Sequence, residues 1–163
     1  MLRPSRLIRV AGVLATLATV ATVSACSPAA KRVTAVRQVD GQPTMLIVGC
    51  DTFDADRVSV STEGVSPPAQ WDADRGTGGA VDEVRLLQSP SGWTVDGRTL
   101  TAFQPGTEYT ASAFDSGQGT VPVRFTLAEL AALPPDQVLV GEPGGKRKAV
   151  TEDAFRRAAK KSC

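Results

Sequence analysis

Short stretches of alternating apolar and polar residues, separated by turn residues, recur along the chain from residue 33 to residue 125. VTAVRQV, RVSVST and EYTASAF are three such stretches. A period of two residues interrupted by frequent turns is typical of strands in a β-sandwich or a barrel. The sequence therefore predicts a mainly β fold of the β-sandwich type.

Turn residues locate several of the expected strands and loops. Gly41-Gln42 predicts one hairpin, and Asp96-Gly97, between two alternating runs, predicts another. The Pro-, Gly- and Asp-rich segment 66–79 is interpreted as a long loop, and 142–148 as an exposed one. Residues 80–88 fit either a strand or a short helix.

Two helices are predicted towards the C-terminal end of the chain. Thr126 and Glu129 form a capping-box pattern, which predicts a short helix near residues 127–132. Thr151 has the character of an N-cap residue and is followed by two acids, which predicts a C-terminal α-helix near residues 151–162.

The N-terminal residues have the pattern of an export signal. A cationic stretch, MLRPSRLIR, precedes an uncharged apolar stretch that is too short to span a membrane. Val23-Ser24-Ala25-Cys26 then resembles the lipobox of bacterial lipoproteins, and the Ala, Arg, Val and Gly bias is similar to that of exported proteins from high-GC Gram-positive bacteria.

The lipobox resemblance implies a division of the chain. Residues 1–25 would be a cleaved signal peptide, residues 26–32 a lipidated tether, and residues 33–163 a single β-rich extracytoplasmic domain with a C-terminal helix. Cys26 would carry a diacylglyceryl group, and two acyl chains suffice for stable anchoring. Two alternatives are an ordinary secreted protein cleaved near Ala25 and an N-terminal anchor that is not cleaved.

The two remaining cysteines, Cys50 and Cys163, predict one disulfide. An even pair in an exported domain favours oxidation. Phe155, Ala159 and Cys163 are spaced by four residues, so they share one face of the C-terminal helix and turn the thiol towards the core. The alternative is two unpaired thiols.

Residues 103–110, FQPGTEYT, resemble the corner before a late strand in fibronectin type III and immunoglobulin-like domains. The resemblance implies an Ig-like sandwich in which Tyr109 hydrogen-bonds the nearby backbone while its ring packs in the core. The helical segments near the C-terminus depart from those families and leave the strand order open.

Composition argues against several classes of function. The chain has no His, so the commonest general base and metal ligand is missing. Beyond Arg3, Arg6 and Arg9 it carries 15 basic and 17 acidic residues, a balance that does not favour nucleic-acid binding. Seven of the basic residues lie between Lys146 and Lys161 and could contact lipid headgroups or form a solvated face.

No residues are assigned to catalysis, to a metal or to a cofactor. The repeated DADR segments, 54–57 and 72–75, lack a full calcium-loop pattern and are interpreted as solvated loop acids paired with their own Arg. Trp93 is expected in the core, whereas Trp71 fits either a core or a binding position.

We expect a membrane-anchored envelope lipoprotein without enzymatic activity, acting as a binding or interaction module. Its expected partners are the membrane, through the lipid, and an envelope protein or a cell-wall polymer. A structural or accessory lipoprotein of an envelope complex is the alternative, and a divergent cell-wall enzyme is a third reading.

Overall fold

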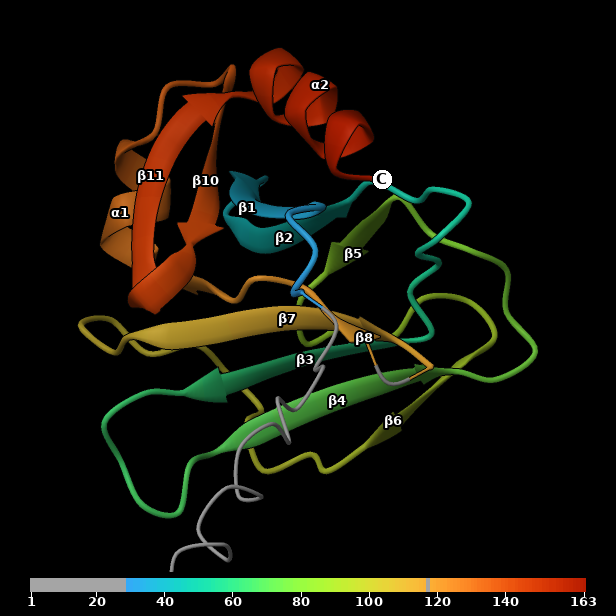
Figure 1. Cartoon of the computed structure of the whole chain (residues 1–163). Helices are drawn as coiled ribbons and strands as arrows, with labels where there is room; N and C mark the ends of the chain where they lie inside the picture. The colour runs from blue at the N-terminus through green and yellow to red at the C-terminus, as the bar shows by residue number, and fades with distance from the viewer. Residues whose placement is uncertain (1–28, 117) are drawn as a thin grey trace, which may run out of the picture.

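The computed structural model describes residues 29–116 and 118–163 and has three layers: a C-terminal helix, a first sheet and a second sheet (Figure 1). The first sheet has the strand order β11-β10-β1-β2-β5, and every pair in it is antiparallel. Its strands are β1 (Thr34–Val39), β2 (Gln42–Ile47), β5 (Glu83–Arg85), β10 (Gln137–Glu142) and β11 (Lys146–Thr151).

The second sheet has the order β6-β4-β3-β7-β8, with β9 also paired to β7, and it too is antiparallel. Its strands are β3 (Arg57–Thr62), β4 (Gln70–Arg75), β6 (Trp93–Asp96), β7 (Tyr109–Asp115), β8 (Gln118–Gly119) and β9 (Val123–Phe125). Two facing antiparallel sheets form the predicted β-sandwich, and the mainly β prediction is confirmed.

The central strands of the second sheet alternate as the sequence indicates. On β3, Val58 and Val60 are fully buried, and their partners across the sheet are apolar residues of β4 and β7. Ser59 and Ser61 lie on the other face. One side of this sheet therefore faces the core between the sheets, and the other side is polar.

The first sheet is covered on both sides. On β2, all five residues from Pro43 to Ile47 are buried, because one face packs on the second sheet and the other lies beneath α2 (Glu152–Ser162) (Figure 1). Phe155 and Ala159 are the buried residues of α2. A strand buried on both faces reads as a continuous apolar run, as in TMLIV.

Both helices begin where the sequence predicts. The short helix α1 (Leu127–Ala132) starts with a complete capping box between Thr126 and Glu129, and α2 starts after Thr151, whose hydroxyl accepts a hydrogen bond from the Ala154 amide. A 3-10 turn, η1 (Pro143–Gly145), joins β10 to β11.

Glu129 connects its helix to the first sheet. Its Oε1 accepts hydrogen bonds from Arg147 of β11 at 2.7 and 2.9 Å. Burial by itself would raise the pKa of Glu129, but the hydrogen bonds from Arg147 and Thr126 outweigh it, so the pKa lies below its ordinary value of 4.5. A carboxyl with a lowered folded-state pKa stabilises the fold above its ordinary pKa, and this contribution is lost as pH falls through the folded-state value.

We therefore expect Glu129→Gln to destabilise the protein at neutral pH but progressively less in acid. The loss at neutral pH should be no more than about 1 kcal/mol, because the side chain is partly exposed and solvent screens the pair. Urea unfolding of both proteins at about pH 7 and about pH 3 measures the difference in free energy of unfolding. An equal difference at both pH values would show that the charge of Glu129 has no such role.

Three local predictions are wrong. Segment 66–79 contains the strand β4, whose residues Trp71 and Ala73 are buried in the core. Residues 146–148 belong to the edge strand β11 and not to an exposed loop. Asp96-Gly97 does not close a hairpin, because β6 pairs with β4 and the amides of Thr99 and Leu100 bond the Gln70 carbonyl.

The corner around residues 103–110 has the expected local geometry. Tyr109 is fully buried, and its hydroxyl accepts a hydrogen bond from the Gln104 amide at 2.6 Å. Its ring packs edge-on against Phe103, with centroids 4.9 Å apart. The expected backbone hydrogen bond and core packing of Tyr109 are confirmed.

Candidate functional site

The described chain enters the fold between the two sheets. The Lys31 amide donates to the Gly119 carbonyl at 3.1 Å, and the Lys31 carbonyl accepts from the Val121 amide at 2.8 Å. Ala29 and Ala30 precede this fixed point, and both line surface depressions of the fold. Lys31 is thus the first described residue that forms backbone–backbone hydrogen bonds with the sandwich.

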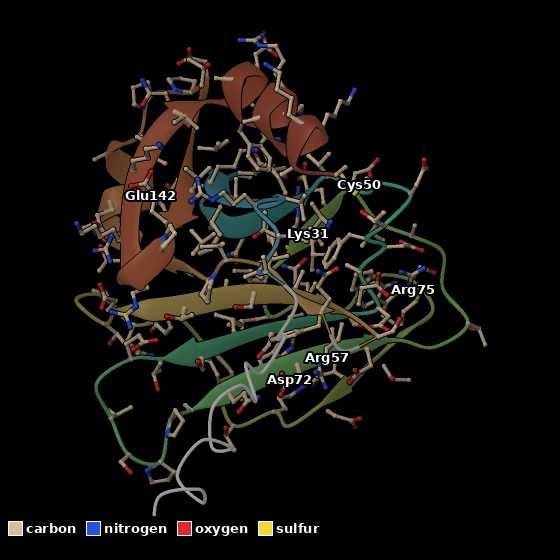
Figure 2. The ribbon with its side chains drawn as sticks, in the orientation of Figure 1. Lys31, Cys50, Arg57, Asp72, Arg75 and Glu142 are labelled. Carbon is tan, nitrogen blue, oxygen red and sulfur yellow. A yellow bond between two sulfur atoms is a disulfide. The ribbon has the colours of Figure 1, made fainter. Side chains whose placement is uncertain are left out.

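The entering chain meets the C-terminal helix and the disulfide. The Lys31 ammonium donates to Thr52 Oγ1 at 3.0 Å, and Thr52 in turn donates to the Cys163 carbonyl at 3.3 Å. Figure 2 shows Lys31 and Cys50 on this side of the molecule, near the end of α2. We call this region the tether junction and define it as residues 29–32, Thr52, Gln118, Ser162 and Cys163.

Cys50 and Cys163 lie at disulfide distance, as the sequence predicts. Their Cα atoms are 5.9 Å apart, within the range of protein disulfides. The bond closes a segment of 113 residues and attaches the end of α2 to the connection between β2 and β3. Phe155 and Ala159 are buried as expected, whereas Cys163 comes after the last residue of α2 and is exposed, so the bond lies at the surface and not in the core.

Positive charge collects around the tether junction. Lys31 and Arg32 belong to the entering chain, and Lys160 and Lys161 come just before Ser162 on exposed positions of α2. Asp51, beside the disulfide, offsets part of this charge. Two cationic residues, Lys31 and Arg32, therefore lie in the tether junction, and Lys160 and Lys161 adjoin it along the chain.

The basic residues at the start of β11, Lys146-Arg147-Lys148, are less available for contact with lipid headgroups than the sequence indicates. Arg147 is ion-paired with Glu108 and Glu129, and Lys148 is paired with Glu142 at 2.6 Å. Ion pairs within the fold therefore offset the charges of Arg147 and Lys148.

The two DADR segments are brought together by the pairing of β3 with β4. Arg75 of the second copy donates to Asp54 of the first copy at 2.8 Å, so the Arg pairs across the copies and not with its own acids. This hydrogen bond lowers the pKa of Asp54 below its ordinary value. Within the described residues, no group of three or more acidic or cysteine side chains is placed to hold a metal ion.

Both tryptophans are core residues. Trp71 is 1% exposed and Trp93 is 6% exposed. The expected core position of Trp93 is confirmed, and of the two positions open to Trp71 the structure shows the core position. Trp93 Nε1 donates to the Gly79 carbonyl at 3.3 Å. Neither ring is available to stack on a ligand at the surface.

The sequence did not reveal the contacts of the tether junction. Lys31, Thr52 and Cys163 are far apart in the chain, and none of them belongs to a recognisable motif. Cys26 and the rest of the lipobox lie outside the described residues. No helix within 29–116 and 118–163 has the length and apolar character to cross a membrane.

Comparisons of the chain with protein-family models, with curated proteins and with solved structures found no match.

Proposed function

We propose that this protein is a lipoprotein anchored through Cys26 to the outer face of the cytoplasmic membrane. The folded part acts there as a non-catalytic binding module. The lipobox pattern supports the anchor, and the disulfide-linked sandwich suits an oxidising compartment outside the cytosol.

The observation that carries the proposal is the short distance along the chain between the anchor and the fold. Lys31, already bonded into the sandwich, is only five residues after Cys26. Five residues span at most about 17 Å when fully extended. A lipid on Cys26 would therefore hold the folded part directly beside the bilayer surface.

The charge of the tether junction supports the same orientation. Lys31, Arg32, Lys160 and Lys161 would face anionic headgroups close to the anchor. Each basic residue near such a surface contributes about 1 kcal/mol, reduced by salt. The acid Asp51 weakens this attraction without reversing it.

Three of the acids hold the fold together. Asp54, Glu108 and Glu129 are occupied by ion pairs with Arg side chains that hold elements of the fold together. General acid-base catalysis requires a titratable group aimed at a substrate with a pKa near the working pH. These carboxylates, with Arg partners, serve the fold instead.

The mass of the intact protein, extracted from membranes without reductant, tests the proposal. We expect a chain that begins at Cys26, carries a diacylglyceryl group and lacks two hydrogens because of the disulfide. Reduction should restore the two hydrogens and leave the lipid in place, since a thioether is not reducible.

Other masses would contradict the proposal in distinct ways. A chain that starts near residue 26 without lipid would indicate an ordinary secreted protein. A chain that retains residues 1–25 would exclude cleavage at the lipobox.

A further inference from the structure

A groove with apolar walls lies between α2 and the first sheet, next to the start of β1. Its volume is about 240 Å³. Its apolar walls come from the loop before β9, from β10, from β11 and from α2; they comprise Val121, Val140, Val150, Ala154, Phe155 and Ala158. The small Ala154 and Ala158, one helical turn apart, leave space that larger side chains would fill.

A few polar groups line the same groove. Thr34 is 4% exposed, and its hydroxyl has no hydrogen-bond partner among the described residues. An unpaired buried hydroxyl destabilises the fold, and a ligand that hydrogen-bonds it removes this cost. Arg32 lies two residues earlier in the chain and is exposed where the groove opens.

The remaining charges leave the opening of the groove positive. Lys148 and Glu142 form an ion pair there, and Arg32 adds a further positive charge (Figure 2 labels Glu142). The hydrogen bond from Lys148 lowers the pKa of Glu142, and the charge of Arg32 acts in the same direction. The three groups together carry a net charge of +1 and suit a ligand with one negative charge.

We propose that this groove binds the acyl chain of a single-chain anionic amphiphile, a long-chain fatty acid. The chain packs on the apolar walls, and the carboxylate accepts hydrogen bonds from Arg32 and from the Thr34 hydroxyl. The inference goes beyond the anchoring of the protein and does not depend on it.

The size of the groove favours one chain over a whole lipid. Small-molecule pockets usually enclose about 300–1,000 Å³, and this groove lies just below that range. A two-chain phospholipid would leave most of its surface outside, whereas a single chain can bury the part next to its carboxylate. An uncharged chain of the same length would lose the contact with Arg32.

Photolabelling of the complete processed protein in isolated membranes tests the proposal. The probe is a long-chain fatty acid with a diazirine in the part of the chain next to the carboxylate, and labelled peptides are identified by mass spectrometry. We expect the label on residues 138–150 and 154–158. An excess of unmodified fatty acid should remove it.

Two substitutions to Trp provide a matched comparison. Ala158→Trp fills the groove and should lower the labelling roughly tenfold, because the Trp side chain occupies the space that the acyl chain needs. Ala132→Trp places the same side chain on an exposed position of α1 and should label like the unsubstituted protein. Label spread evenly over the surface, or undiminished by Ala158→Trp, would overturn the proposal.

The headgroup is tested with Arg32→Gln, an exposed substitution that leaves the packing of the fold unchanged. It should weaken labelling by the fatty acid severalfold and leave labelling by the corresponding fatty alcohol unaffected. Equal labelling of the unsubstituted protein by acid and alcohol would refute the role of the negative charge. The labelling is repeated on soluble Cys26→Ser protein, with the probe added directly. Labelling that persists there separates this site from the anchor, and its loss would overturn the assignment to a free fatty acid.

Discussion

Replacement of Cys26 by Ser should transfer the protein from the membrane to the soluble extracytoplasmic fraction. The hydroxyl of Ser cannot form the thioether that would carry the diacylglyceryl group. Each buried CH₂ of an acyl chain contributes about 0.8 kcal/mol to membrane binding, so losing two chains removes nearly all of the affinity. Fractionation followed by immunoblotting measures the distribution between membrane and soluble fractions.

The fractionation of Cys26→Ser needs two controls. Cys163→Ser also removes a thiol but leaves the lipobox intact, so it should remain in the membrane fraction. Any Cys26→Ser protein held only by the cations of the tether junction should be released by about 1 M salt, where the Debye length is about 3 Å. Cys26→Ser protein that resists this wash would rule out the lipid anchor.

Cys163→Ser should have the largest effect on stability. The Cys50–Cys163 bond closes a segment of 113 residues, and the chain-entropy model gives a loop of this size about 4–5 kcal/mol as an upper figure. The substitution also frees the end of α2, whose last carbonyl accepts a hydrogen bond from Thr52. Denaturant unfolding should show a large decrease in the free energy of unfolding.

The second cysteine provides a matched comparison. Cys50→Ser and the double variant should lose the same free energy as Cys163→Ser, because each removes one and the same covalent bond. Reduction of the unsubstituted protein should give a similar value. Losses that add up in the double variant would mean that the two thiols contribute separately and that no bond joins them in the native protein.

Local patterns were sufficient for much of the fold. The alternation of buried residues in β3 and the caps of both helices follow from contacts within a few residues of the chain. The disulfide was predictable because two cysteines remain besides Cys26, and the spacing of Phe155 and Ala159 identifies the buried face of α2. These features depend little on the arrangement of distant strands.

The errors arise where distant contacts decide the structure. The alternation of Trp71 and Ala73 in β4 was present in the sequence, but the Pro and Gly residues around it gave a stronger turn signal. At Asp96-Gly97 the turn residues are local, while the pairing partner of β6 is chosen by contacts with β4. Turn chemistry bends the chain, but it does not select the neighbouring strand.

The sites could be predicted only in part. The Cys50–Cys163 pair follows from sequence arguments about export and cysteine number, and the lipidation of Cys26 stays a prediction. The groove beside α2 does not, because its walls come from segments separated by more than one hundred residues, from Arg32 to Ala158. The unpaired hydroxyl of Thr34 has no signature in the sequence, since a Thr in a strand ordinarily indicates only β propensity.

The edges of the first sheet have a consequence for crowding. Copies of a protein confined to a membrane plane meet one another far more often than copies in solution, and bare sheet edges would invite them to join strand to strand. Here one edge, β11, carries Lys146 and Lys148, and the other, β5, is only three residues long and bears Glu83 and Arg85. Charge and shortness at these edges oppose fusion of neighbouring sheets, so copies anchored densely in one membrane, as we propose, would remain separate molecules.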